Sequence, residues 1–328
     1  MDIEYLLLLQ KFRELINDFL TPFMELLSLF SISFVVFLPA FIYWVIDKKK
    51  GLFVFLSYYL CCSFNALVKL TACVYRPWIK DPRVIPYGDS LSTATGYSFP
   101  SGHVAISGPI YGGTAIVAKD KKKYISVICI ILLLLTGFSR NYLGVHTPQD
   151  VLVALLETAL ALFAAAKLIA YVEKHPEKEN VLLAASFLIG VIGIFYITFK
   201  PYPMDYVDGK LLVDPLKMMT DGYGDICLLI AFPIARFVER KWVRFEPAGL
   251  KNGGWLMGLI GLLPLGAMML FLKNWLDALL GAHWGHFTYS IIAVLYCIAL
   301  YPALINLYHR IKNKKNAEEK PEEYSDAE

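Results

Sequence analysis

The most constraining feature of this sequence is a series of apolar blocks, each long enough to cross a lipid bilayer. Hydrophobic residues make up 57% of the 328 residues and only 18% are charged, against roughly a quarter in an average soluble protein. A helical span needs about 20 apolar residues. We predict an all-α, polytopic membrane protein with about nine transmembrane helices, at roughly 23–46, 51–73, 102–118, 124–139, 149–171, 181–199, 223–239, 254–272 and 286–308.

The basic residues between these blocks fall on one side of the membrane when the spans are taken in order. The positive-inside rule places such connections in the cytoplasm. An odd number of spans then puts the N-terminus outside and the C-terminus inside. We therefore expect a multi-pass protein of the plasma or inner membrane. The residues that set this orientation are Lys48–Lys50, Lys119, Lys121–Lys123, Arg240, Lys241, Arg244, Arg310, Lys312, Lys314 and Lys315.

The two ends of the chain differ from the apolar blocks. Residues 1–21 begin with Asp2 and Glu4 and lack a basic leader, so a signal peptide is not expected. At about 100° per residue, their leucine and phenylalanine side chains share one half of a helical wheel, which predicts an amphipathic helix in the outer interface. Residues 311–328 are polar and charged and are expected to form a disordered cytoplasmic tail.

Composition also excludes several kinds of partner. The net charge of +3 is small and scattered, so no nucleic acid is expected. The six cysteines lie in or beside apolar blocks and form no C-x-x-C pair, which argues against a zinc site or a disulfide framework. The membrane bilayer is the partner that the sequence predicts.

Two cations lie near the outer end of the second span, in KLTACVYRPW. Lys69 lies within the apolar block and Arg76 at its end. A spacing of seven predicts that both share one helix face, roughly 10 Å apart along the axis. Pro77 is expected to end the helix at Arg76. A charge within a span is costly and usually marks a site, although a lysine that snorkels to the surface is the simpler alternative.

A histidine follows a helix N-terminus at the start of the third span, in GYSFPSGHV. Ser101 and Gly102 lie where backbone N–H groups are free to bind an anion, and His103 stands just inside the helix. The alternative is an ordinary interfacial histidine.

A second histidine precedes the fifth span, in SRNYLGVHTPQD. Thr147 suits the N-cap, Pro148 suits the first helical position, and Asp150 completes a capping box. Asp150 is also placed to reach the ring of His146, fix its tautomer and leave the other ring nitrogen free to attack. Taken alone, Asp150 could merely cap the helix.

All three segments lie on the outer face in this topology. Together they provide three cations, Lys69, Arg76 and Arg140, with two helix N-termini and two histidines. A phosphoryl group needs such features: positive charge for its equatorial oxygens, an in-line nucleophile and an acid for the leaving oxygen. We therefore predict a phosphoryl-transfer site rather than three unrelated surface features.

These motifs resemble those of the type 2 phosphatidic acid phosphatase superfamily, which includes lipid phosphatases, glucose-6-phosphatase and vanadium haloperoxidases. The three signatures occur in order and without substitution: Lys69, six residues and Arg76-Pro77; then Pro100-Ser101-Gly102-His103; then Ser139-Arg140, five residues, His146, three residues and Asp150. The segment GYSFPSGH is most similar to the corresponding motif of the bacterial membrane lipid phosphatases. We expect residues 22–175 to form the phosphatase core and residues 176–310 to add further transmembrane helices.

The resemblance implies a role for each motif residue. His146 would attack phosphorus and form a phosphohistidine, and Asp150 would orient it. His103 would protonate the leaving alkoxide. The phosphoryl oxygens would be held by Lys69, Arg76, Arg140, Ser101 and the Gly102 N–H. The phosphatases of the family need no metal, so neither a metal nor another cofactor is expected.

The resemblance leaves more than one function open. The expected substrate is a lipid phosphate, such as phosphatidate, phosphatidylglycerophosphate or a polyprenyl pyrophosphate, cleaved on the extracytoplasmic face. A glucose-6-phosphatase-like enzyme acting on a soluble sugar phosphate is the main alternative, because about nine spans and an outside N-terminus resemble that topology. A non-catalytic lipid binder or transporter is disfavoured because His103, His146 and Asp150 are all retained. A haloperoxidase is disfavoured because those relatives are soluble.

Several polar residues on the outer face have no role in this scheme. They are expected to be helix caps or interfacial residues, with a lid over the site or contact with a headgroup as the alternative. They are Lys80, Arg83, Asp221, Asp225, His283 and His286.

Overall fold

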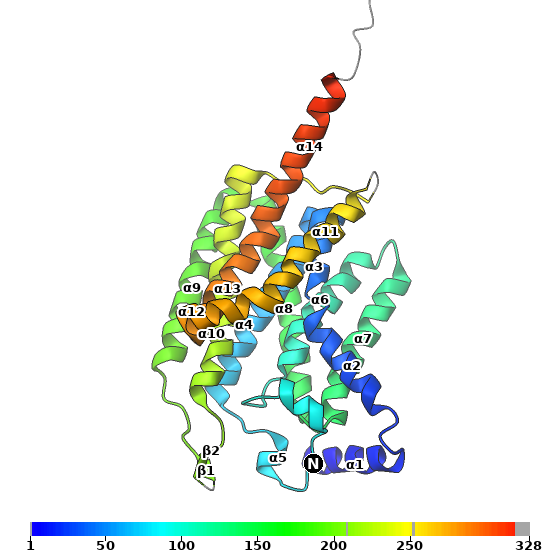
Figure 1. Ribbon diagram of the computed structural model, residues 1–328, viewed down its shortest axis with the longest axis vertical. Helices are drawn as coiled ribbons and strands as arrows, with labels where there is room; N and C mark the ends of the chain where they lie inside the picture. Colours follow the sequence, from blue (N-terminus) through cyan, green and yellow to red (C-terminus); the bar gives the residue numbers. More distant parts are fainter. Residues whose placement is uncertain (1, 208, 251–252, 319–328) are drawn as a thin grey trace, which may run out of the picture.

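The computed structural model describes residues 2–207, 209–250 and 253–318, and nearly all of its regular structure is helical (Figure 1). The expected all-α class is confirmed. Helices α1 to α8 are Asp2–Leu15, Thr21–Ser33, Phe37–Phe41, Lys48–Ala72, Pro77–Lys80, Gly102–Ala118, Lys123–Tyr142 and Pro148–Lys174. Helices α9 to α14 are Glu179–Phe199, Pro215–Val238, Gly254–Ala267, Lys273–Leu280, Ala282–Leu295 and Tyr301–Glu318.

Short irregular segments join or extend these helices. Turns of π helix lie at Ile42–Ile46, Glu239–Val243, Met268–Leu272 and Tyr296–Leu300, and 3₁₀ turns at Gly88–Thr93 and Pro176–Lys178. A small antiparallel hairpin pairs β1 (Tyr206–Val207) with β2 (Lys210–Leu211), with Tyr206 opposite Leu211.

Each expected span has a helical counterpart, but the count of nine is not confirmed. Within the described residues, seven helical segments have the length and hydropathy of a membrane span, and α2 with Phe37–Ile46 forms an eighth that bends by 47°. The remaining expected span is α6, which has only 17 residues, fewer than the about 20 that cross a bilayer comfortably. α6 packs against α4, α7 and α8, so protein rather than lipid surrounds much of it.

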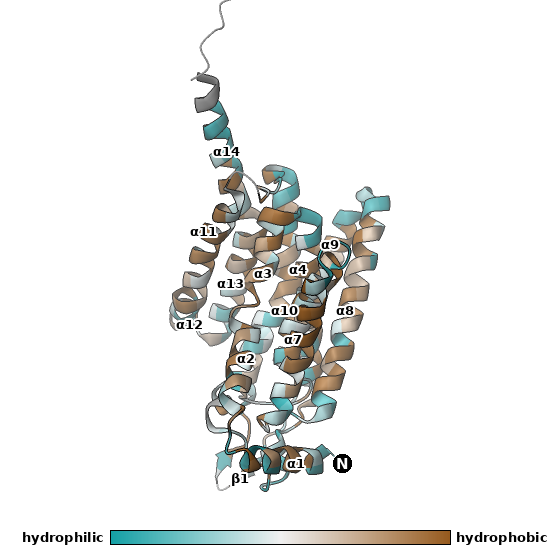
Figure 2. Ribbon diagram, turned by 90° about the vertical axis from the view of Figure 1, so that its right-hand side faces the viewer, coloured by the Kyte–Doolittle hydropathy of each residue, from teal (hydrophilic) through white to brown (hydrophobic). Residues whose placement is uncertain are grey.

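The connections between the helices gather at two ends of the bundle (Figure 1). One end, which we call the α1 end, holds α1, α5, the β hairpin and the link between α7 and α8. The other, the α14 end, holds the α6–α7, α8–α9 and α10–α11 connections. The lysines and arginines that set the predicted orientation are concentrated at this end. Figure 2 shows hydrophobic residues along the middle of the bundle and hydrophilic residues towards both ends, as expected for helices in a bilayer.

Helix α4 is the centre of the fold. It packs against α6 and α8, which carry motif residues, and also against α10. Helix α10 in turn packs against α9 and α13. The contact between α4 and α10 therefore joins the helices that carry the three motifs to the helices that follow them.

Helices α6 and α8 approach each other closely because α6 carries glycines at the contact. A Cβ at Gly108 would lie 2.3 Å from Thr158 Oγ1, and one at Gly112 would lie 2.8 Å from Leu162 Cδ1. Near the α1 end, the Ser101 N–H donates to the Asp150 carbonyl at 3.0 Å. The N-termini of the two helices that carry motif residues are thus fastened together.

Helix α1 lies across the α1 end of the bundle (Figure 1) and differs in one respect from the expected amphipathic pattern. Leu8, Phe12 and Leu15 are exposed, as an interfacial helix requires, but the charged residue Arg13 is buried. Its guanidinium donates to the carbonyls of Ile85 and Tyr142, at 2.9 and 3.3 Å. The helix ends at Leu15 and also braces the loop that leads to the second motif.

The C-terminal expectation is wrong for the part of the tail that the structure describes. Helix α14 continues to Glu318, so 311–318, expected to be disordered, are helical. The rest of the expected tail, 319–328, lies outside the described residues. All six cysteines are buried and free. The sequence had predicted no disulfide framework.

Candidate active site

His146 lies in the short link between α7 and α8, where a tight turn fixes its position. The N–H groups of Val145 and His146 both donate to the Arg140 carbonyl, at 3.1 and 3.2 Å. Gly144 has a φ of 75°, a left-handed conformation that glycine adopts without strain. Asn141 Nδ2 donates to the His146 carbonyl at 2.9 Å. The imidazole is held almost out of contact with solvent, at 1% exposure.

The predicted capping box at the start of α8 is confirmed. The Asp150 N–H donates to Thr147 Oγ1 at 3.4 Å, and the Thr147 N–H donates to Asp150 Oδ2 at 2.9 Å. The same Oδ2 lies 3.2 Å from His146 Nδ1 and accepts a hydrogen bond from Ser98 Oγ at 2.5 Å. A carboxylate at Nδ1 favours the tautomer that carries its proton there, which leaves Nε2 with a free electron pair.

The surroundings of His146 keep its ring neutral. Burial, and then the positive charge of Arg76, lower the pKa of His146 well below its ordinary value of 6.5, although the hydrogen bond to Asp150 acts in the opposite direction. A neutral imidazole is the form that can act as a nucleophile.

Arg76 reaches His146, but not from the helix face that its spacing from Lys69 predicts. Helix α4 ends at Ala72, and Cys73 takes a left-handed conformation with φ 48°. The helix therefore ends four residues before the predicted stop at Arg76, whose backbone is extended. The expected shared helix face is wrong, because the chain turns away before Arg76 is reached.

Four contacts hold the Arg76 guanidinium in the site. Its Nη1 donates to the Val145 carbonyl at 2.9 Å and lies 2.9 Å from His146 Nε2. Its Nε and Nη2 donate to the carbonyls of Gly96 and Thr95, at 3.1 and 3.2 Å. With the proton on Nδ1, His146 Nε2 is the acceptor of the Arg76 Nη1–H, so the charge of Arg76 lies directly at the unprotonated ring nitrogen.

The second motif forms the N-terminus of α6, as predicted. The helix begins at Gly102 with Ser101 as its N-cap, and neither Ser101 Oγ nor His103 Nε2 has a hydrogen-bond partner among the described protein atoms. Both residues are buried, Ser101 fully and His103 at 6% exposure. Lys69 reaches this segment and donates through Nζ to the Pro100 carbonyl. The alternative interpretation, in which Lys69 snorkels to the surface, is therefore not what the structure shows.

Arg140 lies at the end of α7 and is buried, with 1% exposure. Its Nη1 donates to Ser28 Oγ at 2.5 Å, whereas Nε and Nη2 have no partner among the described atoms. Buried donors of this kind are costly unless they bind something. Together with Ser101 Oγ, they fit the oxygens of a phosphoryl group.

Five of the motif residues line one cavity of about 340 Å³, whereas Ser101, Arg140 and Asp150 are not among its lining residues. His103 and His146 both line it, as do Lys69, Arg76 and Gly102. The three motifs, which are separate in the sequence, therefore supply one site at the same end of the bundle. Positive charge, two imidazoles and a helix N-terminus at one cavity form a site suited to phosphoryl transfer.

The comparison with known protein families agrees with this geometry. A family model described as the PAP2 superfamily matches residues 50–174. The matched segment contains the three motifs that carry the resemblance. No curated protein and no solved structure matches the chain.

The match supports the resemblance drawn from the motifs, and every predicted site residue lies inside the matched segment, which we call the PAP2 segment. It supports a phosphatase activity, and the long apolar helices support an integral membrane protein. The likeness to bacterial enzymes stays a prediction.

Three residues near the site were not predicted, although each had a signal in the sequence. Ser98 lies in the second motif segment, two residues before Pro100, and bonds Asp150. Asn65, one turn before Lys69, donates to Glu157 Oε2 at 2.7 Å. Glu157 lies two turns after Asp150. Helical spacing could have predicted this pair, because Asn65 shares a face of α4 with Lys69 and Glu157 shares a face of α8 with Asp150.

The polar residues without a predicted role divide into two groups. Arg83 is exposed and pairs with Asp81 and Glu4, and neither it nor Lys80 lines the cavity. His283 binds the Leu216 carbonyl through Nε2 at 3.0 Å and also lies outside the cavity. Asp221, Asp225 and His286, by contrast, all line it.

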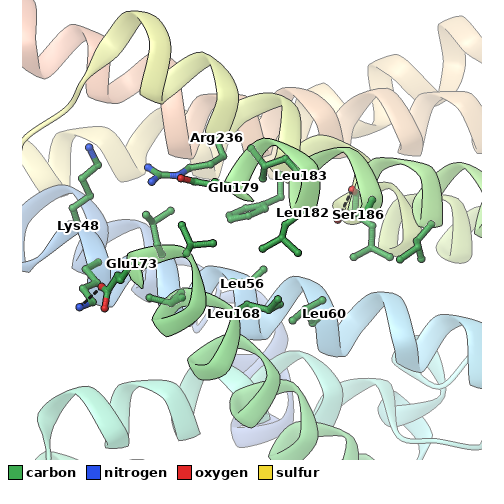
Figure 3. A pocket seen from close by; sticks show the side chains of 18 residues that line it. Lys48, Leu56, Leu60, Leu168, Glu173, Glu179, Leu182, Leu183, Ser186 and Arg236 are labelled. Atoms are coloured by element: carbon green, nitrogen blue, oxygen red, sulfur yellow. Dashed lines mark hydrogen bonds and ion pairs between the residues drawn. The ribbon is translucent and has the colours of Figure 1, made fainter. Parts of the chain in front are cut away.

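A second cavity, of about 530 Å³, has a different character (Figure 3). It lies between α4, α8, α9 and α10, and its wall is largely aliphatic, with Leu56, Leu60, Leu168 and Leu182 among its residues. Charged side chains occur at its edge, where Glu179 pairs with Arg236. None of the PAP2 motif residues lines this cavity, so it is separate from the candidate active site.

Proposed function

We propose that the protein hydrolyses the phosphomonoester or pyrophosphate of a lipid through a phosphohistidine at His146. The observation that supports this most is a pair of buried imidazoles at one cavity. Asp150 holds His146 by Nδ1, and His103 Nε2 has no partner among the described protein atoms. Double displacement at phosphorus needs a nucleophile and an acid that act on the same group.

In the first step, the electron pair of His146 Nε2 attacks phosphorus. The N–P bond forms as the bond from phosphorus to the leaving oxygen breaks, and protonated His103 gives its proton to that oxygen. The His146 ring becomes positively charged while Nδ1 keeps its proton. The Asp150 carboxylate at 3.2 Å stabilises this charge.

In the second step, water replaces the released alcohol. Neutral His103 accepts a proton from the water as its oxygen attacks phosphorus. The N–P bond breaks, inorganic phosphate is formed, and the electron pair returns to Nε2. His103 is protonated again and ready for the next cycle.

The phosphoryl oxygens are bound by the cations that line the cavity and by buried donors beside it. Lys69 and Arg76 line the cavity, and Arg140 and Ser101 hold buried donors without partners among the described atoms. The free N–H of Gly102 adds the partial positive charge of a helix N-terminus. Since three side-chain cations neutralise the phosphate, the proposed reaction uses no metal ion.

A lipid substrate is favoured by the apolar part of the cavity wall. Ile32, Leu70, Ile106 and Met218 line the same cavity as the histidines. The site also lies at the α1 end, away from the basic connections at the α14 end. By the positive-inside rule, we place the reaction on the extracytoplasmic face of the plasma or inner membrane.

A substrate panel on the purified protein tests the proposal. Phosphatidate, phosphatidylglycerophosphate, undecaprenyl pyrophosphate and glucose 6-phosphate are compared, with the release of inorganic phosphate as the readout. We expect release from at least one of the lipids and none with His146→Ala. Release from glucose 6-phosphate alone would replace the lipid by a soluble sugar phosphate. No release from any substrate by folded protein would favour a non-catalytic lipid binder.

A further inference from the structure

The second cavity lies where two consecutive helices diverge. Helix α8 packs against α4 and α6, whereas α9 packs mainly against α10. Beyond their link at Pro176–Lys178, α8 and α9 make almost no contact with each other. The cavity of about 530 Å³ occupies this gap (Figure 3). Ala185 and Ile189 of α9 line it and are exposed, so the cavity is accessible from the bilayer.

The aliphatic wall of this cavity has the depth of one leaflet. Leu52, Leu56 and Leu60 of α4 line it at intervals of four residues and therefore share one helix face. From Lys48 to Leu60 the helix rises roughly 18 Å, at about 1.5 Å per residue. One leaflet of hydrocarbon is about 15 Å thick, half of the bilayer core. The cavity therefore suits an acyl chain that runs from the membrane surface towards the midplane.

Polar side chains gather at one end of the cavity, whereas leucines follow the rest of the wall (Figure 3). Among the described lining residues, the polar one within the aliphatic wall is Ser186, whose Oγ already donates to the Leu229 carbonyl at 2.9 Å. An extended peptide here would leave its backbone N–H and C=O groups without partners. A lipid, with one polar end and an apolar chain, fits this distribution. The charged lining residues are Lys48, Lys49, Glu173, Glu179 and Arg236.

The buried ion pairs at the polar end contain more cations than carboxylates. Lys48 and Arg236 both pair with Glu239, at 2.7 and 2.5 Å. Arg236 and Arg240 both pair with Glu179, at 2.8 and 3.0 Å. Three cations therefore share two carboxylates in these pairs. The excess is one positive charge, which favours a headgroup with one net negative charge.

A further lysine at the mouth of the cavity is held only by an exposed partner. Lys49 pairs with Glu173, and their side chains are 64% and 46% exposed. An exposed ion pair contributes little to stability. Lys49 can therefore exchange the Glu173 carboxylate for the phosphate of a lipid, because a lysine donates equally well to either oxygen acid.

We propose that the second cavity binds one acyl chain of a phospholipid with a single net negative charge, whose phosphate lies at Lys49 beside Lys48 and Arg236. The lipid joins α8, in the PAP2 segment, to α9, which follows it. It is a bound ligand and not a substrate, since none of the PAP2 motif residues lines the cavity. The inference is independent of the proposed function, and its failure would leave that proposal intact.

Native mass spectrometry of the full chain, purified in detergent, tests the proposal. The probes are phosphatidylglycerol and phosphatidylcholine with identical acyl chains. Both are phosphodiesters, so neither is a phosphomonoester of the kind proposed for the active site. One phosphatidylglycerol molecule should bind with a dissociation constant about fivefold lower than that of phosphatidylcholine, the factor that one charge near a membrane surface supports.

Variants at the polar end test the position of the phosphate. Lys49→Gln removes the excess charge, so the two lipids should bind about equally. Glu173→Gln removes the competing carboxylate, so the preference for phosphatidylglycerol should rise above that of the wild type. The matched control is Lys123→Gln, an exposed lysine at the same end of the bundle that does not line the cavity, and it should keep the wild-type preference.

Variants of α9 test the position of the acyl chain. Ala185→Phe places a ring in the cavity and should weaken the binding of both lipids by about tenfold, since the ring takes the place of several buried methylene groups. Ala184→Phe adds the same ring at an exposed neighbour that does not line the cavity, and it should bind both lipids like the wild type. Without added lipid, each variant should unfold at the wild-type temperature, which shows that the fold is kept.

Three outcomes would overturn the proposal, each for a different reason. Equal binding of the two lipids by the wild type would mean that the polar end does not select an anionic headgroup. Equal effects of Ala185→Phe and Ala184→Phe would place the lipid outside the cavity. A wild-type dimer that Ala185→Phe converts to a monomer would make a second copy of the chain the occupant.

Discussion

One oxygen of Asp150 serves both the cap of α8 and the imidazole of His146. Its Oδ2 lies 3.2 Å from His146 Nδ1 and 2.9 Å from the Thr147 backbone nitrogen. The same oxygen accepts a hydrogen bond from the Ser98 hydroxyl at 2.5 Å. Because the cap fixes this oxygen relative to the helix, the start of α8 sets the orientation of the ring. The helix cap and the orientation of the nucleophile are therefore one interaction.

Replacing Asp150 separates these two roles. We expect Asp150→Asn to lower the rate of phosphoenzyme formation by about 10²-fold, within the range typical of a lost proton-handling partner. The asparagine oxygen can still accept the Thr147 N–H, so the capping box is kept and stability should change little. Asparagine carries no charge to stabilise the phosphorylated ring and does not enforce the tautomer. Rapid-quench measurement of the phosphoenzyme gives the rate.

The matched variant is Thr147→Ala, which removes the other half of the capping box. It should cost about 1 kcal/mol of stability and have only a small effect on the rate, because Asp150 still reaches His146. If Thr147→Ala and Asp150→Asn slowed the reaction equally, capping alone would explain the role of Asp150.

The pH dependence should reflect a His146 that resists protonation. Burial and the charge of Arg76 lower its pKa well below 6.5. The neutral, nucleophilic form is therefore present at neutral pH and is lost only as the pH falls through the lowered value. With an aryl phosphate substrate, the acid limb of kcat/KM should lie below pH 6.5. The ionisation of the substrate is measured separately by phosphorus NMR, and an acid limb at or above pH 6.5 after that correction would contradict the assignment.

Local patterns in the sequence predicted the parts of the site that depend on neighbouring residues. The Thr147-Pro148-x-Asp150 cap is encoded within four residues, and the structure has it as expected. The N-terminus of α6 at Ser101 and Gly102 is equally local. The resemblance then assigned roles to residues that composition could only place on one face.

Positions that depend on contacts distant in the sequence could not be predicted. Arg76 leaves the helix because carbonyls from Thr95, Gly96 and Val145 hold its guanidinium elsewhere. Arg13 is buried because two carbonyls in other segments accept from it. The packing of α10 against α4 depends on the contact between two helix surfaces and not on a sequence motif. This packing brings Asp225 to the cavity.

The close approach of α6 and α8 should tolerate no side chain at Gly108. A Cβ there would lie 2.3 Å from Thr158 Oγ1, so Gly108→Val forces the two helices apart. We expect a loss of about 1–3 kcal/mol, as for other overpacked cores, together with a lower rate because α6 and α8 carry His103 and Asp150. Thermal unfolding in detergent gives the stability. Gly88→Ala, where a Cβ meets nothing within 4 Å, is the control and should unfold like the wild type.

Metal removal and vanadate test how the phosphate charge is neutralised. If Lys69, Arg76 and Arg140 supply the positive charge as proposed, activity should survive EDTA. Vanadate should inhibit, since its trigonal-bipyramidal adduct resembles the transition state. Complete loss in EDTA that magnesium restores would show that a metal ion is needed.

The last prediction separates the two histidines by the leaving group. His146→Ala removes the nucleophile, so no phosphoenzyme should form on any substrate. His103→Ala removes only the acid, whose contribution is about 10²–10⁴-fold. An aryl phosphate with a low-pKa phenol leaves without a proton, so it should recover much of the activity of His103→Ala in the formation of the phosphoenzyme. It should recover none of the activity of His146→Ala, because His103 lies at the start of α6 and lacks the Asp150 contact that orients the nucleophile. If the aryl substrate rescued His146→Ala and left His103→Ala inactive, the two residues would have exchanged roles, and His103 would be the phosphorylated residue.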